Sequence, residues 1–132
     1  YPAKYPGREN SLYINNPKII RLSEVYLIAA EAALYAENPE KDTDFYMNEL
    51  RKNRISNYTN GSDFTIDDVL KERRVELFTE NSMSFDYWRN KKSVKSFHVG
   101  ESINYDDYRT VLPIPQDEID LSGGILVQNP NY

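Results

Sequence analysis

The 132-residue chain contains no cysteine and only one histidine. The lack of cysteine excludes disulfides, thiolate metal sites and a catalytic thiol. Without a second histidine or a thiol, a transition-metal site is not expected, and His98 is predicted to lie at the surface. No apolar run approaches the ~20 residues that a membrane span requires. The chain opens without a signal peptide or an initiator methionine, so we expect any export signal to lie upstream.

Positive charge is also scarce: 16 basic residues stand against 21 acidic ones, and the net charge is −5. Nucleic-acid binding requires a basic surface, so nucleic acid is excluded as an expected partner. Hydrophobic residues make up 39% and charged residues 28%, which is typical of one folded domain or part of one. Tyrosine is abundant, with 11 residues, and its amphipathic ring suits partly wet packing surfaces and binding faces.

Hydrophobic spacing predicts a mostly α-helical chain in three parts. Residues 1–17 are expected to form an irregular lead-in, residues 18–90 to form two helix pairs, and residues 91–132 to form a loop and a strap. The first helix is predicted from Lys18 to about Glu37. Its inner face is expected to consist of residues at three- and four-residue spacing: Leu22, Val25, Ala29, Ala32 and Ala36.

Three further helices are predicted before residue 91. The second begins at Asp42 or Thr43 and ends near Ile55, with Tyr46, Leu50 and Phe45 as its candidate inward residues, and a turn is expected at Asn60-Gly61. The third begins after Thr65, a candidate cap, and is broken by Asn81-Ser82. Its inner stripe is predicted to be Ile66, Val69, Leu70, Arg73 and Leu77. A short fourth helix ends near Asn90, and a short strand is predicted near Phe97.

The C-terminal strap combines three prolines with apolar residues: residues 112–121 read LPIPQDEIDL and residues 128–132 read QNPNY. Each proline fixes its own φ and restricts the preceding residue, so the strap is predicted to be extended and not helical. Its apolar residues are expected to be buried against the helix pairs: Leu112, Ile114, Ile119 and Leu121.

Five motifs in the same order resemble the SusD/RagB family of outer-membrane glycan-binding lipoproteins. Besides the strap, these are RLSEVYLIAAEA at 21–32, NELR at 48–51, LKERRVEL at 70–77 and FDYWR at 85–89. Together they cover roughly residues 18–132, and agreement of five ordered motifs by chance is improbable. Asn131 stands where the family usually has glycine.

The resemblance implies a C-terminal, tetratricopeptide-like helical domain that is a fragment of a longer protein. It implies non-catalytic binding of oligosaccharides or polysaccharides and their delivery to a SusC-like TonB-dependent transporter. The implied location is the outer membrane, as a surface-exposed lipoprotein whose anchor lies upstream of this chain. The glycan platform of the family is built mostly from upstream segments. The alternative from another class is a helical-repeat module that binds a protein segment in a groove.

The charged residues on the predicted helices have a catalytic and a structural interpretation. Glu72, Glu76 and Glu80 are four residues apart, and paired carboxylates can cleave glycosidic bonds. Arginines interleave them, and an arginine lowers the pKa of a carboxylate, which favours structural ion pairs and argues against an enzyme. The predicted structural network contains eight residues: Arg21, Glu24, Glu31, Arg73, Arg74, Glu76, Asp86 and Arg89.

Aromatic residues could stack on sugar rings. Phe85 and Trp88 are three residues apart on a short helix, so we predict that they are core anchors. The first candidates for ligand contact are Tyr105 and Tyr108, in a polar loop with Arg109, although a solvated loop also explains them. No calcium-loop, phosphate-loop or nucleophile-elbow pattern occurs, so no cofactor is predicted.

Overall fold

The computed structural model describes residues 19–80, 83–95 and 100–132, and most of its regular structure is helical, as the sequence predicted. The predicted lead-in, the break at residues 81–82, and both Phe97 and His98 lie outside the described residues. The chain divides into two compact units, Tyr1–Glu72 and Arg73–Tyr132, and each is considered by itself.

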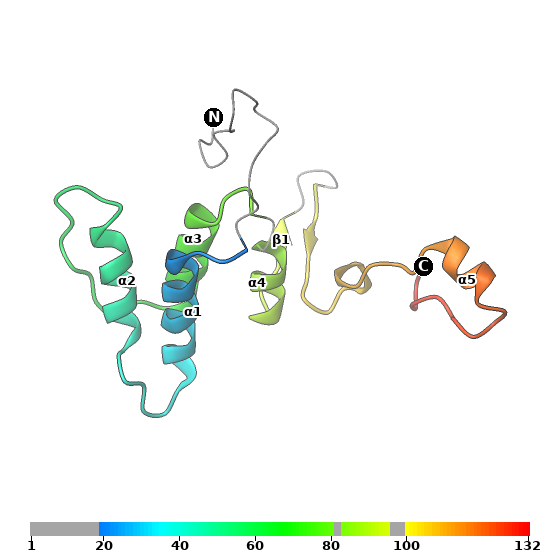
Figure 1. The fold of residues 1–132 in the computed structure, drawn as a ribbon, viewed down its shortest axis with the longest axis horizontal. Helices are drawn as coiled ribbons and strands as arrows, with labels where there is room; N and C mark the ends of the chain where they lie inside the picture. The colour runs from blue at the N-terminus through cyan, green and yellow to red at the C-terminus, as the bar shows by residue number, and fades with distance from the viewer. Residues whose placement is uncertain (1–18, 81–82, 96–99) are drawn as a thin grey trace, which may run out of the picture. The chain divides into compact units, whose positions relative to one another are not determined.

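The first unit is built on an antiparallel helix pair. Helices α1 (Leu22–Tyr35) and α2 (Thr43–Lys52) pack side by side in Figure 1, which confirms the first predicted pair. The Asp42 carboxylate caps α2 by accepting a 2.8 Å hydrogen bond from the amide of Phe45. The Thr43 hydroxyl donates to the Ala30 carbonyl at 3.0 Å, so the first residue of α2 is also bound to α1.

The predicted inner face of α1 is wrong. The helix buries the stripe that contains Leu27 and Ala30, whereas Leu22 and Val25 are exposed. At about 100° per residue, the buried and the predicted stripes lie on roughly opposite sides of the helix. The buried stripe also contains Ser23 and Glu31, so hydrophobic periodicity favoured the more apolar stripe, which the structure leaves largely exposed. The core of the unit joins residues of three helices: Leu27, Ala30, Met47, Leu50 and Val69.

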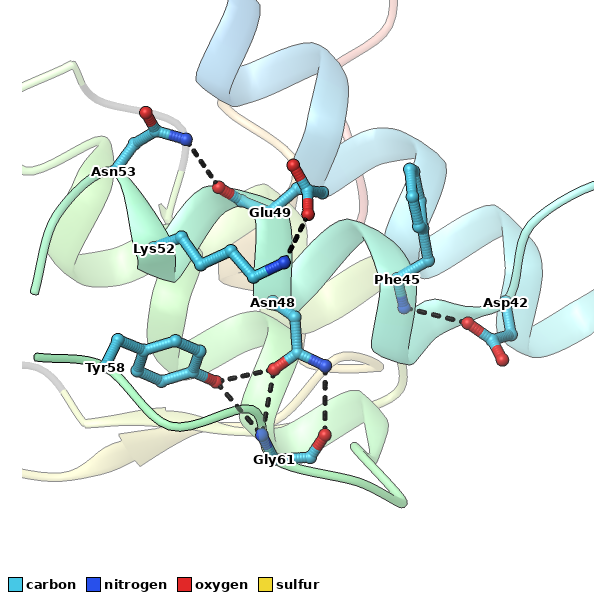
Figure 2. Close-up of polar contacts among 8 residues, drawn as sticks. All are labelled: Asp42, Phe45, Asn48, Glu49, Lys52, Asn53, Tyr58 and Gly61. Carbon is cyan, nitrogen blue, oxygen red and sulfur yellow. Dashed lines mark hydrogen bonds and ion pairs between the residues drawn. The ribbon is translucent and has the colours of Figure 1, made fainter.

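The loop after α2 is held by one amide side chain, shown in Figure 2. Asn48 donates to the Gly61 carbonyl at 2.9 Å and accepts from the Gly61 amide at 2.9 Å and from the Tyr58 hydroxyl at 2.7 Å. A Cβ atom at Gly61 would lie 2.6 Å from the tip of the Phe64 ring, so a larger residue there would force that ring to move. The turn predicted at Asn60-Gly61 is not formed: the turns of this loop lie at residues 53–54 and 56–57, and the Asn48 side chain holds Gly61 instead.

Helix α3 (Ile66–Glu76) carries the predicted inner stripe: Val69, Leu70 and Arg73 are buried on it, as is Leu77 just beyond its end. Thr65 precedes the helix as predicted, but its amide and hydroxyl both donate to the Asp68 carboxylate, at 2.9 and 2.7 Å. The helix ends at Glu76, earlier than the predicted break at residues 81–82. Thr79 has a φ of 71°, which a helix cannot accommodate.

The second unit continues with α4 (Met83–Arg89) and a small antiparallel pair of strands, β1 (Val94–Lys95) and β2 (Ser102–Ile103). Trp88 is half-buried, and its indole N–H donates to the Ile103 carbonyl at 3.4 Å. Phe85 packs edge-on against Trp88 but is 64% exposed. The prediction of a core anchor is therefore wrong for Phe85, because the buried position of α4 is Asp86, about 100° around the helix from it.

The strap follows a 3-10 turn, η1 (Tyr108–Thr110), and contains a short helix, α5 (Gln116–Leu121). The prediction that the strap has no helix is wrong. Its prolines restrict residues up to Pro115, which precedes α5 with a φ of −53°, and no proline occurs within α5 itself. The predicted burial is also wrong for Leu112 and Leu121, which are 79% and 83% exposed, whereas Ile114 and Ile119 are partly buried. The strap closes through hydrogen bonds to its backbone, which do not require these two leucines to be buried.

Candidate functional site

Gln128 closes the strap by pairing with a backbone segment far from it in sequence. Its amide side chain accepts from the Ile114 N–H at 2.9 Å and donates to the Ile114 carbonyl at 2.8 Å, as a neighbouring strand would. The Asn129 side chain donates to the Leu112 carbonyl, and the Tyr132 hydroxyl donates to the Val111 carbonyl. The LPIP and QNPNY motifs are thus two sides of one closure, which we call the C-terminal clasp (residues 111–114 and 128–132).

Asn131 in the clasp has a φ of 73°. This left-handed conformation costs glycine nothing and is tolerated by asparagine better than by most residues. The asparagine therefore preserves the backbone of a position at which glycine would be expected.

The two candidate tyrosines lie beside the clasp. Tyr105 and Tyr108 are both about half exposed, and the Tyr108 ring packs edge-on against Tyr132 at 5.1 Å between centroids. The Arg109 guanidinium lies 5.9 Å from the centre of the Tyr108 ring. The structure thus joins Tyr108 to Arg109 and Tyr132, and leaves the Tyr105 ring accessible.

A close ion pair fixes the charge of this loop. Arg109 donates to both carboxylate oxygens of Asp107, at 2.8 and 2.7 Å, and its backbone amide donates to the same carboxylate at 2.9 Å. These hydrogen bonds lower the pKa of Asp107 to about 2. The bond to Asp107 in turn raises the pKa of Arg109. Both groups are therefore charged at neutral pH, and Asp107 is unsuited to act as a general acid.

Three members of the predicted charge network meet in the second unit. Arg73 Nε lies 2.9 Å from Asp86 Oδ2, and both side chains are more than nine-tenths buried. Arg89 Nη2 lies 2.9 Å from Asp86 Oδ1, and the Arg89 side chain is half exposed. Asp86 thus joins α3 to α4, and we call these three residues the Asp86 triad.

The other members are distributed over both units. Arg21, Glu24 and Glu31 lie on or beside α1, where Glu31 is buried. Arg74 and Glu76 lie on α3, and Arg74 is exposed to solvent. That these residues extend the Asp86 triad remains a prediction.

An ion pair between α2 and α3 was missed by the sequence reasoning. Arg51 Nε donates to Glu72 at 2.8 Å, and its guanidinium lies 4.7 Å from the centre of the Phe64 ring. Burial lowers the pKa of Arg51, but hydrogen bonds and charge attraction from Glu72 and Tyr58 outweigh this effect and raise the pKa. Glu72, a candidate for acid–base work, is therefore held in a structural pair. In the sequence, only the charged residues of the NELR and LKERRVEL motifs pointed to an ion pair between these two helices.

A pocket of about 250 Å³ was also missed. It lies between the start of α1 and the end of α2 and is lined by seven residues: Leu22, Ser23, Tyr26, Glu49, Leu50, Asn53 and Arg54. Ser23 is buried, and its hydroxyl oxygen has no hydrogen-bond partner. Nothing in the sequence indicated this pocket, because a serine on an amphipathic helix is common.

The part of the chain that the structure describes covers residues 19–80, 83–95 and 100–132. Within that range, no group of three or more histidine, cysteine, aspartate or glutamate residues is arranged to hold a metal ion. Nor does that range contain a helix with the length and hydropathy needed to cross a bilayer.

The helix pair, the charged α3 and the clasp define a tetratricopeptide-like helical domain of the kind found in the SusD superfamily. The family model described as the SusD family matches residues 2–132, and the chain belongs to that family.

Individual relatives agree with the family assignment. A crystal structure of a SusD superfamily protein from Bacteroides thetaiotaomicron is 38% identical, with a TM-score of 0.86 over 98% of this chain. Another, from Bacteroides vulgatus, is 37% identical, with a TM-score of 0.73 over 89% of this chain. A curated SusD-like protein from Bacteroides ovatus is 28% identical over 89% of this chain. The chain spans 31%, 28% and 23% of these three relatives, respectively.

Proposed function

We propose that this chain is the C-terminal helical part of a non-catalytic protein that captures oligosaccharides or polysaccharides at the bacterial cell surface. The protein passes the glycan to a SusC-like TonB-dependent transporter and is held at the outer membrane by a lipid anchor upstream of these residues. The observation that carries the proposal is the SusD family match over residues 2–132.

The contacts within the chain support capture without catalysis. Two carboxylates are engaged by arginines: Glu72, one of the predicted acid–base candidates, by Arg51, and Asp107 by Arg109. A general acid requires a raised pKa, whereas the pKa of Asp107 is lowered. These pairs instead hold helices and loops in place, as a scaffold requires.

Within this chain, Tyr105 and Tyr108 are the proposed sugar contacts, in the loop that precedes the strap. Exposed aromatic rings beside a charged pair offer an apolar face and hydrogen-bond partners together, which suits a sugar ring. The two tyrosines contribute only a secondary part of the glycan affinity if the main binding platform lies in upstream segments.

Affinity electrophoresis of the complete gene product in gels containing polysaccharide tests the proposal. Retardation by at least one polysaccharide, with no reducing ends released on incubation, is the expected result. Release of reducing ends that disappears in a Glu76→Gln variant would instead establish an enzyme. Co-purification of a SusC-like transporter from solubilised outer membranes tests the proposed delivery.

The second candidate function is a helical-repeat module that binds a protein segment. The apolar outer stripe of α1 favours it, because Leu22, Val25 and Ile28 are exposed. The two functions differ in one outcome: a repeat module binds a peptide and leaves the migration of the protein in polysaccharide gels unchanged.

A further inference from the structure

The loop between α2 and α3 contains the only Asn-Gly pair in the sequence, Asn60-Gly61. Asn60 is exposed to solvent. In such a pair the glycine nitrogen can attack the side-chain amide carbon of the asparagine, because glycine has no Cβ to obstruct the approach and its backbone is conformationally permissive. The loop therefore contains the reacting groups for a spontaneous deamidation that needs no reagent except water.

The reaction has two balanced steps. The Gly61 nitrogen loses its proton to solvent and forms a bond to Asn60 Cγ, while the Cγ–Nδ2 bond breaks and Nδ2 takes up a proton and leaves as ammonia. Water then opens the resulting succinimide ring. Attack of water at Cγ gives aspartate, whereas attack at the backbone carbonyl carbon gives isoaspartate, in which the chain continues through the side chain.

The Gly61 nitrogen is held by Asn48, as Figure 2 shows. The Gly61 N–H donates to Asn48 Oδ1 at 2.9 Å, and Asn48 Nδ2 donates to the Gly61 carbonyl at 2.9 Å. Asn48 is buried on α2, and its Oδ1 also accepts from the Tyr58 hydroxyl at 2.7 Å. Because the Gly61 N–H must reach solvent to lose its proton, the contacts with Asn48 have to open before the ring can close.

The residues that follow Asn60 are held by two more side chains of α2. Phe64 covers Gly61, since a Cβ atom on this glycine would lie 2.6 Å from the Phe64 ring. The Arg51 guanidinium lies 4.7 Å from the centre of the same ring, and Asp44 accepts from the Phe64 amide at 3.0 Å. The α2 helix therefore restricts the local opening that the reaction requires.

We propose that Asn60 is a modification site at which deamidation gives aspartate and isoaspartate, and that Asn48 sets the rate by holding the Gly61 nitrogen. The product adds a carboxylate to a loop that already contains Asp63. Isoaspartate also lengthens the backbone by one carbon atom, which displaces Gly61 from its two bonds with Asn48. The modification thus releases this loop from α2 irreversibly. The inference is independent of the proposed glycan binding.

Asn48→Ala is the informative variant, because it removes both hydrogen bonds to Gly61. Deamidation at Asn60 is expected to accelerate roughly five- to thirtyfold, the effect of losing one or two hydrogen bonds. Thr43→Val is the matched control, since it removes the hydrogen bond of another buried α2 side chain, the one to the Ala30 carbonyl. This control should leave the deamidation rate unchanged, because the bonds that hold Gly61 remain.

The experiment incubates the complete gene product at neutral pH and follows deamidation by mass spectrometry. Trypsin releases residues 55–71, which contain both Asn57 and Asn60, and fragmentation shows which amide has become a carboxylate. A methyltransferase specific for isoaspartate detects the second product. Conversion is expected at Asn60 and not at Asn57, because the residue after Asn57 is Tyr58, whose side chain obstructs the attack.

The expected result is slow conversion of Asn60 in the unaltered protein and fast conversion in Asn48→Ala, with faster hydrogen exchange at the Gly61 amide. Equal rates in these two proteins, or the same acceleration in Thr43→Val, would overturn the proposal, as would the absence of conversion in every variant. If Asn48→Ala does not fold, Tyr58→Phe takes its place, because it removes a hydrogen bond that orients Asn48. Acceleration in Tyr58→Phe then supports the proposal, and an unchanged rate overturns it.

Discussion

The Asp86 triad gives a stability prediction with an internal control. Arg73→Ala removes a buried cation and leaves the Asp86 carboxylate, whose side chain is 8% exposed, with Arg89 as its remaining partner in the triad. Breaking a buried ion pair typically costs about 3–5 kcal/mol. Because Arg89 still holds the second oxygen, we expect a loss near the lower limit, about 3 kcal/mol.

The control is Arg74→Ala, which removes the same charge from the next residue of α3. Arg74 is exposed, so its replacement is expected to change stability by less than about 0.5 kcal/mol. In a chain of this size, about 3 kcal/mol lowers the melting temperature by roughly 10 °C, and the control should stay within about 2 °C.

Circular dichroism melts of the two variants and of Arg73→Ala/Asp86→Ala test this account. The double variant contains no uncompensated carboxylate, so its loss should be smaller than the sum of the two single losses. Equal melting temperatures for Arg73→Ala and Arg74→Ala would refute the reasoning, because they would mean that the Arg73–Asp86 pair is solvated.

Three further predictions concern the loop, the clasp and the acid titration. Gly61→Ala should destabilise the first unit by about 1–3 kcal/mol, because its Cβ would meet the Phe64 ring; a melt that matches Ser62→Ala would contradict this. Gln128→Ala should accelerate hydrogen exchange at the Ile114 amide, whereas Gln116→Ala, which removes only a surface bond to Asp120, should not. NMR titration should give Asp107 a pKa of about 2, below the ordinary 3.8, and Arg109→Gln should raise it. Since the folded-state pKa is the lower one, the stability from this pair is present above pH ~4 and is lost as the pH falls through about 2; an Asp107 pKa unchanged by Arg109→Gln would contradict the assignment.

The sequence predicted an element well where only one arrangement of its apolar residues was possible. On α3, the outward residues are charged except Val75, so the inner stripe had to contain Val69 and Leu70, and it continues to Leu77 just beyond the helix. On α1, the stripe with Leu22 and Val25 is more apolar than the buried stripe, which contains Ser23 and Glu31, so the buried side depends on where α2 packs. Contacts with α2 determine which side of α1 is buried. Thr43 donates a hydrogen bond to Ala30, and the Met47 side chain lies in the same core cluster.

The strap shows a different limit. Proline chemistry correctly indicates that residues 112–115 are not helical, but it has no influence on the six residues that follow and form α5. The pairing of Gln128 with Ile114 spans 14 residues and leaves no local pattern. The pocket was equally hidden, because an unsatisfied serine hydroxyl is a property of three-dimensional packing alone.

Calorimetric titration of the complete gene product with maltose-, xylose- and mannose-based oligosaccharides tests the central claim most directly. The account predicts saturable binding of at least one oligosaccharide, with the ligand recovered intact afterwards. The absence of binding to all three series, together with saturable binding of a peptide, would contradict glycan capture and support the helical-repeat alternative.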